Sequence, residues 1–227
     1  MVQISPTKEL FEYHPGAVIG VLELSGVDNS SPAPALNERK RELEASLRAQ
    51  YEGFARPDFN NLLVIAAYRR YYKRFKKTYH VQLQIESIVL KDKSLPQVSP
   101  LVDANFMAEV EHLVLTAGHD VGKLKGPVVM DISVEGDTII QMDGTGKALL
   151  PGDMIMRDAG GVSCSVIYGQ DNRSFITRKT SQALYITYGP EGVPVETIQA
   201  HQEAILAYVR LFSPAAVVEQ QHLISVG

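Results

Sequence analysis

The sequence predicts an α+β fold in which N-terminal helices precede a mixed, mostly antiparallel sheet. Up to Gly118, several segments carry apolar residues at helical spacing. From Pro127 onward, short β-like runs alternate with turns rich in glycine and aspartate. Helices and strands therefore fall largely into separate parts of the chain, which argues against the repeated βαβ units of a parallel sheet.

Local signals place the elements in chain order. An apolar run predicts a first strand over 17–24, and Ser30 to Pro34 form a linker. Ser99 and Pro100 suit the N-cap and first position of a helix. Helices are expected over 35–51, 57–77, 81–89, 99–118 and 194–212. Strands are expected over 127–134, 137–142, 153–158, 161–169 and 183–189. We expect one domain over 1–227 and assign no structure to 213–227.

Composition excludes several classes of protein. Of the 227 residues, 45% are hydrophobic and 21% are charged, which suits a folded domain with a core. The net charge of −4 argues against wrapping of nucleic acid over the whole surface, and no DNA partner is expected. Cys164 is the single cysteine, so an internal disulfide and a Cys-cluster zinc site are excluded. We expect neither metal nor cofactor.

The chain carries no segment that predicts a membrane protein. No apolar run approaches the roughly 20 residues that a membrane span needs. The first residues lack the basic and then apolar pattern of a signal peptide. A cytoplasmic protein is therefore expected.

Six basic residues lie within nine positions near the end of the helix expected over 57–77. They share one side of that helix, while Tyr71, Tyr72 and Phe75 lie on the other side, and we expect the cations to point away from these rings. Two interpretations stay open: a solvated face whose cations suit the helix dipole, or a surface that contacts RNA phosphates. The candidate RNA-binding residues are Arg69, Arg70, Lys73, Arg74 and Lys77.

The helix expected over 99–118 has two informative sides. Its apolar side is expected to pack on a sheet formed by the segments after Pro127. Asp103 lies on this apolar side, so we expect it to cap backbone or to pair internally. The apolar side contains Phe106, Val110, Leu113 and Val114.

A polar stripe runs along the same helix and suits either a hydrated surface or a site for an amino group or a ribose hydroxyl. His119 and Asp120 follow on an expected loop, where a general base, a substrate hydrogen bonder or a structural turn would each fit. The stripe consists of Asn105, Glu109, His112 and Thr116.

Two turns join strand-like runs, at 143–146 and at 158–161. Neither matches a phosphate-binding glycine motif, so we interpret both as hairpin turns, with close approach of their backbone to a small ligand as the alternative. Cys164 has no basic neighbour in its run and is predicted to be a buried, inert thiol.

Motifs in a fixed order support one resemblance. Leu95-Pro96 precedes Pro100-Leu101-Val102-Asp103, and Gly118-His119-Asp120 follows after a helix. Further along come the runs 141–144, 150–158 and 180–186. From about Tyr72 to Pro190, the chain resembles the B3/B4 tRNA-editing domain of phenylalanyl-tRNA synthetase β subunits, and it looks like a free-standing member of that family.

The resemblance implies binding of an aminoacyl group, or of an aminoacyl-tRNA 3′ end, and hydrolysis of mischarged tRNA. Two family positions depart from the pattern, since the family histidine falls on Ala117 and the family glutamate on Ile186. A non-catalytic module that binds a small amino-acid-like ligand or a protein therefore stays open as the alternative.

The expected ligand site lies between the polar stripe, the 119–120 loop and the two turns, and we expect it to be the largest cavity. No catalytic residue is assigned. The candidate substrate-binding residues are Asn105, Glu109, His119, Asp120, Asp143, Gly144, Thr145, Asp158 and Gly160.

Overall fold

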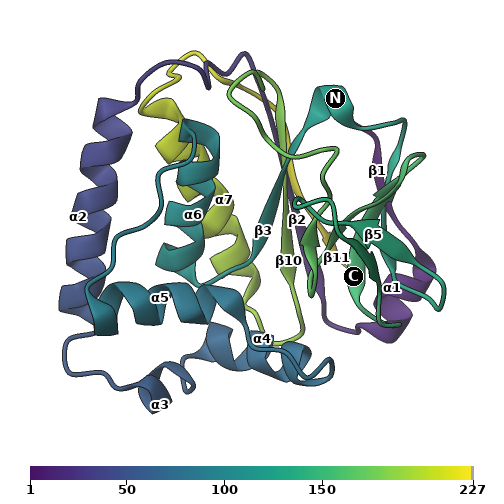
Figure 1. Ribbon diagram of the computed structural model, residues 1–227, viewed down its shortest axis with the longest axis horizontal. Helices are drawn as coiled ribbons and strands as arrows, with labels where there is room; N and C mark the ends of the chain where they lie inside the picture. Colours follow the sequence, from purple (N-terminus) through teal and green to yellow (C-terminus); the bar gives the residue numbers. More distant parts are fainter. Residues whose placement is uncertain (226–227) are drawn as a thin grey trace.

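The computed structural model describes residues 1–225, whose elements form three layers (Figure 1). Helices form the first layer, a four-stranded sheet lies in the middle, and a five-stranded sheet forms the third. This arrangement confirms the predicted α+β class with a mixed, mostly antiparallel sheet.

The bounds of the elements follow the chain. The helices are α1 (Lys8–Tyr13), α2 (Pro34–Gln50), α3 (Arg56–Phe59), α4 (Leu63–Lys73), α5 (His80–Lys91), α6 (Pro100–His112) and α7 (Val195–Arg210), with a 3-10 turn η1 (Val121–Lys123). The four-stranded sheet has the order β11 (Val217–Ser225), β2 (Val18–Ser25), β10 (Ala183–Gly189), β3 (Thr116–Asp120).

The five-stranded sheet has the order β1 (Ile4–Pro6), β4 (Val128–Ile132), β7 (Met154–Asp158), β8 (Gly161–Ser165), β9 (Gly169–Gln170). A separate hairpin joins β5 (Thr138–Ile140) to β6 (Gly146–Ala148). Within residues 1–225, β1 and β4 form the one parallel pair of strands.

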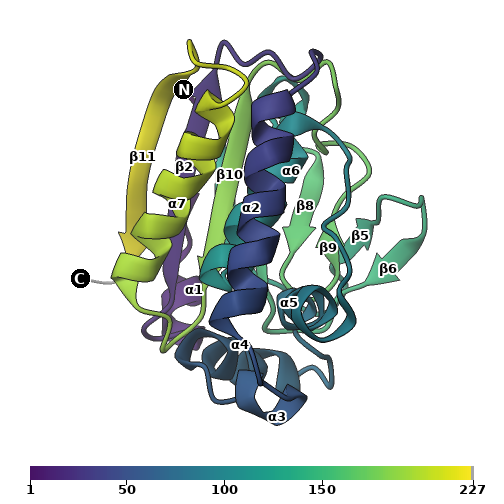
Figure 2. The same ribbon diagram turned by 90° about the vertical axis from the view of Figure 1, so that its left-hand side faces the viewer.

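The four-stranded sheet is buried on both faces. Leu22 and Leu24 of β2 face the helical layer, where α6 and α7 cover the sheet and α2 packs on the outer side of α6 (Figure 1, Figure 2). Ile19 and Val21 of the same strand belong to the second core, between the two sheets. Because side chains alternate along a strand, one continuous apolar run supplies both cores.

Buried tyrosines of α4 form hydrogen bonds with both sheets. The Tyr68 hydroxyl donates to the Tyr188 carbonyl of β10 at 2.5 Å and accepts from the Leu115 N–H at 2.9 Å. The Tyr72 hydroxyl donates to the Val166 carbonyl, just after β8, at 2.8 Å. These bonds satisfy hydroxyl groups that would otherwise be costly to bury.

The helix expected over 57–77 is two helices. Residues 60–62 separate α3 from α4, and α4 ends at Lys73. Lys76 then adopts a left-handed conformation with φ of 55°, and the Lys77 N–H bonds the Tyr72 carbonyl at 3.1 Å. The pattern of apolar residues continued past these breaks, so periodicity alone did not reveal them.

The helix expected to end near Gly118 ends at His112. Leu113 takes a left-handed conformation with φ of 60°, and the Tyr79 hydroxyl caps its carbonyl at 2.9 Å. Residues 116–120 form β3 instead and pair with β10. Pairing with a neighbouring strand has overridden the local helical pattern, so Thr116 lies on a strand and His119-Asp120 is not on a loop.

The packing of α6 was predicted in part. Leu101 and Val110 are fully buried between α6 and its neighbours, which are α7, α2 and the four-stranded sheet. Two strands of that sheet, β2 and β3, precede Pro127, so the expectation of a sheet formed after Pro127 is wrong for them. Phe106 is only partly buried.

Asp103 is paired internally, as predicted. Its carboxylate contacts Lys40 of α2 at 2.6 Å and accepts from the Val98 N–H at 2.8 Å. Both charged side chains are less than a tenth exposed. The pair joins α2 to the start of α6.

The remaining differences concern segments without strong local signals. β1, α1 and β6 were not predicted, and the unassigned tail contains β11. The turns at 143–146 and 158–161 do join antiparallel strands, as expected for hairpins. None of the helices described over 1–225 is both long and apolar enough to cross a membrane.

Replacing Lys40 by methionine should lower the free energy of unfolding by about 3 kcal/mol, because Asp103 would keep a buried charge without its partner. Urea unfolding measures this change. The additional substitution Asp103→Leu should recover part of the loss. Lys8→Met, which breaks an exposed pair with Glu12, is the control and should change stability by less than about 1 kcal/mol. Equal losses in both single variants would contradict the prediction.

Candidate functional site

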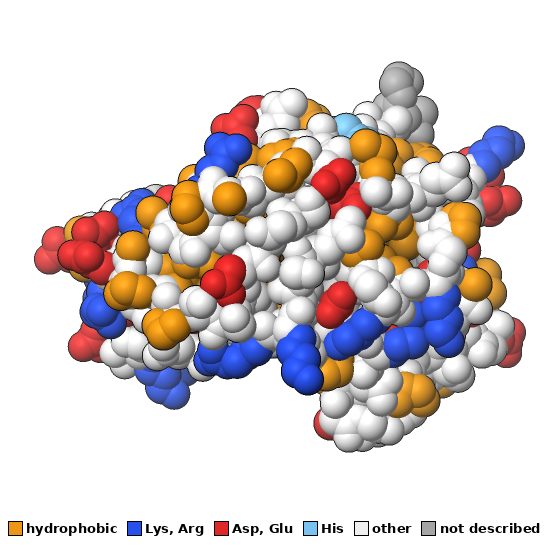
Figure 3. All heavy atoms as spheres, turned by 90° about the horizontal axis from the view of Figure 1, so that it is seen from above, with side chains coloured by type: hydrophobic (Ala, Val, Ile, Leu, Met, Phe, Trp, Pro, Cys, Tyr) orange, Lys and Arg blue, Asp and Glu red, His pale blue; other side chains and the backbone are white. Residues whose placement is uncertain are grey.

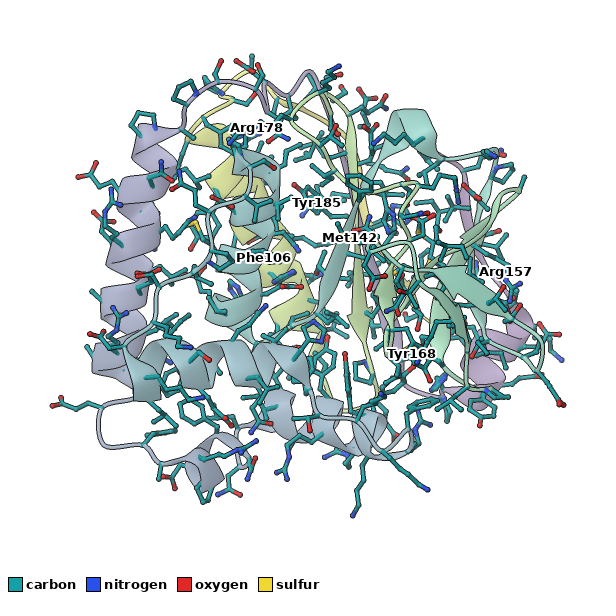
Figure 4. All side chains as sticks on the ribbon, viewed as in Figure 1. Phe106, Met142, Arg157, Tyr168, Arg178 and Tyr185 are labelled. Carbon is teal, nitrogen blue, oxygen red and sulfur yellow. The ribbon has the colours of Figure 1, made fainter. Side chains whose placement is uncertain are left out.

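A cavity of about 360 Å³ lies where the helical layer meets both sheets. We call it the interlayer pocket. It is enclosed by α5 and α6 on one side, by β3 and β10 on a second, and by β8, β9 and the β5–β6 hairpin on a third. Figure 4 shows Phe106, Tyr185 and Met142, three of its lining residues, gathered in this region.

The walls of the interlayer pocket are mostly apolar. Phe106, Tyr185 and Ile176 supply bulky surfaces, and Met142 lies at an exposed edge, with 60% of its surface accessible. Further apolar lining comes from Val98, Val102, Leu115, Ala117, Val166 and Phe175. Such a lining with a few polar groups is typical of a site for a small organic ligand.

Two carboxamides in the wall have buried atoms without hydrogen-bond partners among the described residues. These atoms are the Gln84 Oε1 of α5 and the Asn105 Oδ1 of α6. The Tyr188 hydroxyl, also in the wall, lies beside the Cys164 thiol, which is a weak hydrogen-bonding group. A buried polar atom without a partner costs free energy that a ligand can recover by supplying one.

Glu109 provides a buried carboxyl group in this wall. It lies one helical turn after Asn105, is 2% exposed, and accepts from the Thr116 N–H at 2.9 Å. Burial raises the pKa of its carboxyl to about 8, while bonds from Thr116 and Asn105 act in the opposite direction. The side chain is therefore mostly protonated at neutral pH and can donate a hydrogen bond.

Of the candidate substrate-binding residues, Asn105 and Glu109 line the interlayer pocket. His119 does not line it. His119 is fully buried in β3, its Nδ1 bonds the Ser174 hydroxyl at 2.7 Å, and burial lowers its pKa to about 3. It contacts the site through Gln170, a lining residue whose amide lies 3.1 Å from that nitrogen.

The other candidates lie outside the pocket and stabilise turns. Asp120 accepts from the Gly122 N–H and the Thr180 hydroxyl. Asp158 is held by Arg173 in a two-point ion pair, at 2.8 and 2.9 Å. The Asp158 carboxylate also accepts from the backbone N–H of Gly160.

Asp143 and its neighbours Gly144 and Thr145 are exposed at the tip of the β5–β6 hairpin, where the Asp143 carboxylate accepts from the Thr145 N–H. The pocket contacts this hairpin through Met142 instead. Cys164 is buried as predicted, and burial raises its pKa to about 12.

Sequence reasoning missed His80 and Gln84, which lie one turn apart on α5. His80 is exposed at the rim, and its Nδ1 lies 3.2 Å from the Tyr72 hydroxyl. Packing against Tyr72 and Tyr79 removes water from part of the ring and lowers its pKa. The expected helix began at residue 81, so His80 lay outside it, and nothing local showed what the side of the helix with Gln84 contacts.

A second cavity, of about 620 Å³, lies between α3, α4 and the start of α5. We call it the cationic groove. It is larger than the interlayer pocket, so the prediction that the ligand site would be the largest cavity is wrong. Its basic lining residues are Arg56, Arg69, Arg70, Lys73, Lys76 and Lys77.

Arg74 is separated from the other candidate RNA-binding residues. Its guanidinium lies over the Tyr71 ring, 4.7 Å from the centroid, and bonds the His14 Nδ1 at 3.1 Å. The expectation that Arg74 points away from the aromatic rings is wrong. Arg74 keeps helical backbone angles at the C-cap of α4, with φ of −59° and ψ of −30°, so it lies one turn after Tyr71 and packs on that ring.

Within residues 1–225, no group of three or more His, Cys, Asp or Glu side chains is arranged to hold a metal ion. Neither the interlayer pocket nor the cationic groove is lined by such a group.

No family model and no curated protein matches the sequence. Among solved structures, the chain is similar to an N-terminal fragment of the phenylalanyl-tRNA synthetase beta subunit from Pyrococcus horikoshii, with a TM-score of 0.49 and 7% sequence identity. The alignment covers 96% of this chain and 54% of that fragment, so the chain spans about half the fragment's length. This is a weak fold-level similarity, and the resemblance to the B3/B4 domain stays a prediction.

The raised pKa of Glu109 predicts a pH-dependent stability. The folded state holds this proton up to about pH 8, whereas an unperturbed glutamate releases it near 4.5. Stability from this group is therefore lost as the pH rises between these values, by at most about 1.4 kcal/mol per pH unit. Glu109→Gln should abolish that dependence, and the unfolding free energies of both proteins across this pH range measure it.

The exposed Glu42 provides a control, since Glu42→Gln should leave the pH dependence as in the wild type. If the unfolding free energies of wild type and Glu109→Gln change with pH in the same way, the Glu109 carboxyl does not retain its proton on folding.

Proposed function

We propose that the interlayer pocket binds an α-amino acid, or an aminoacyl group, that has an apolar side chain. Its volume of about 360 Å³ falls within the range of small-ligand sites. Apolar walls would bury the ligand's side chain and exclude water from it. The exposed rim at His80 and Met142 leaves room for the end of the ligand that is attached to something larger.

The observation that carries this proposal is the pair of carboxamides without partners. Gln84 Oε1 and Asn105 Oδ1 are buried acceptors in one wall, and Glu109 lies beside Asn105. An amino group has several N–H donors on one atom and satisfies such acceptors together. An all-apolar ligand would leave these atoms unpaired, which disfavours it.

Hydrolysis of an aminoacyl ester is the finer proposal, and two titratable groups favour it. Glu109, protonated at neutral pH, is a candidate acid, and His80, mostly neutral there, is a candidate base. His80 would take a proton from a water that attacks the ester carbonyl. Glu109 would donate its proton to the departing alcohol oxygen, so that acid and alcohol are the products.

The ester proposed is that of an aminoacyl-tRNA 3′ end, and mischarged tRNA would be the substrate. The alternative is a non-catalytic module that binds a free amino-acid-like ligand, or a protein, with the same pocket. Both functions require the Gln84 and Asn105 contacts. They differ in whether the bound ester is hydrolysed.

Binding is tested by calorimetry with a panel of free amino acids and their amides. Apolar side chains should bind, and charged ones should not. Gln84→Leu should weaken binding roughly tenfold by removing one hydrogen-bond acceptor. Its unfolding free energy should stay the same or rise, because the substitution removes a buried atom that has no partner.

Gln50→Leu, at an exposed glutamine of α2, is the matched control and should leave binding unchanged. The proposal fails if no apolar amino acid binds, or if Gln84→Leu retains full affinity.

A deacylation screen against mischarged tRNAs separates the enzyme from the binding module. The wild type should release amino acid from at least one ester, and Glu109→Gln should lower that rate at least tenfold while amino-acid affinity changes little. Binding of amino acids without hydrolysis of any ester would leave the non-catalytic module as the function.

A further inference from the structure

The cations of the cationic groove are mostly without anionic partners. Arg56 pairs with Glu86 at 3.3 Å. For the rest of the basic lining, no carboxylate within residues 1–225 comes within ion-pair distance. These five residues are Arg69, Arg70, Lys73, Lys76 and Lys77. In a chain with a net charge of −4, they form a concentrated region of positive charge.

The helix dipole explains only part of this cluster. Arg70 and Lys73 lie in the last turn of α4, where cations are stabilised by the C-terminal end of the helix. Arg69 and Lys73 are four residues apart on the same helix, a spacing at which like charges repel. Lys76 and Lys77 follow after the helix has ended. A solvated helix face therefore does not account for the set.

Lys76 adds a conformational argument. Its φ of 55° is in the left-handed region, where glycine is favoured and other residues cost about 1 kcal/mol. The chain has a lysine at this position, immediately after the end of α4, and that lysine lines the groove. A positively charged side chain thus occupies a position where glycine would cost less backbone free energy.

The opposite end of the molecule has a different distribution of charged side chains. Seen from above, on the side away from α4, lysine and arginine side chains are mixed with aspartate and glutamate (Figure 3). Ion pairs such as Lys123–Asp120 and Arg173–Asp158 occur elsewhere in the chain. The groove is distinguished by cations that lack such partners around a hollow surface.

We propose that the cationic groove binds consecutive phosphate groups, such as those of a single RNA strand. A concave, positively charged groove follows the backbone of a single strand, whereas a flat anionic surface could not enter it. Asn60 also lines the groove, and its side-chain carbonyl oxygen accepts from the amide of the buried Gln82 at 2.8 Å. This proposal is independent of the ligand of the interlayer pocket.

The two sites nevertheless share one element. Tyr79 and Gln82 line the groove, while His80 and Gln84 line the interlayer pocket. The first turn of α5 therefore separates the two cavities. A ligand that carries phosphates beside an apolar group could occupy both.

The test measures binding of a short single-stranded RNA by fluorescence anisotropy at several salt concentrations. Neutralising five phosphates gives a slope of about −3.5 in the log–log plot, at roughly −0.7 per phosphate. The double substitution Arg69→Gln and Lys73→Gln should reduce that slope by about 1.4 and weaken binding at least tenfold. Both side chains are exposed, and their mutual repulsion is removed, so folding is retained.

The substitution Lys76→Gly tests the effect of charge on binding without lowering stability. It removes one cation at a position where glycine suits the backbone, so binding should weaken while the unfolding free energy stays equal or rises. Lys179→Gln, at an exposed cation that lines neither cavity, is the control and should bind as the wild type does.

Inorganic tripolyphosphate is the second probe. Tripolyphosphate that binds as tightly as RNA, and is weakened by the same substitutions, would show that the groove binds a compact chain of phosphates. That result also supports binding of consecutive phosphate groups. Absence of binding of both probes at low salt overturns the proposal, as does a folded Arg69→Gln, Lys73→Gln variant with unchanged affinity. Amino-acid binding to the interlayer pocket should be the same in all these variants.

Discussion

The hydroxyl groups of the α4 tyrosines fix the distance between the helical layer and the two sheets. Tyr68 bonds β10 and the backbone just before β3, Tyr72 bonds the chain after β8, and the Tyr71 hydroxyl contacts Asp153 and the Met154 N–H at the start of β7. Tyr68 also stacks on Tyr79 with ring centroids 4.2 Å apart. Each hydroxyl lies in the core, so moving α4 would leave several polar groups unpaired at once.

Both cavities depend on that position of α4. The exposed side of the helix forms one wall of the cationic groove, and its buried side supports Tyr79, which precedes α5. α5 in turn carries His80 and Gln84 into the interlayer pocket. The tyrosines thereby place a charged surface and an apolar cavity on two sides of one helical turn, although neither cavity contains Tyr68 or Tyr72 in its wall.

The sequence predicted the fold class, the internal pairing of Asp103 and the burial of Cys164, because each follows from a local pattern or from composition. It did not predict the end of α6 at His112, since Val114 to Ala117 continue an apolar spacing and only β10 makes them a strand. The strand β11 lies in a tail with little periodicity and depends on pairing with β2.

The candidate site was predicted to a similar extent. Asn105 and Glu109 were found because helical spacing brings them to one face. Gln84 lies on another helix, and its place in the same wall depends on how α5 packs against α6. Asp158 was a candidate because it lies in a turn, but its carboxylate is occupied by Arg173.

The order of strands in the central sheet has a consequence for folding. β2, at residues 18–25, has as its neighbours β10 and β11, which are separated from it by most of the chain. During synthesis, β2 lacks both neighbouring strands until β10 has been made, and it lacks one of them until β11 follows. Such long-range pairing slows folding and leaves an apolar strand exposed, so the emerging chain is at its most vulnerable to aggregation before β11 is complete.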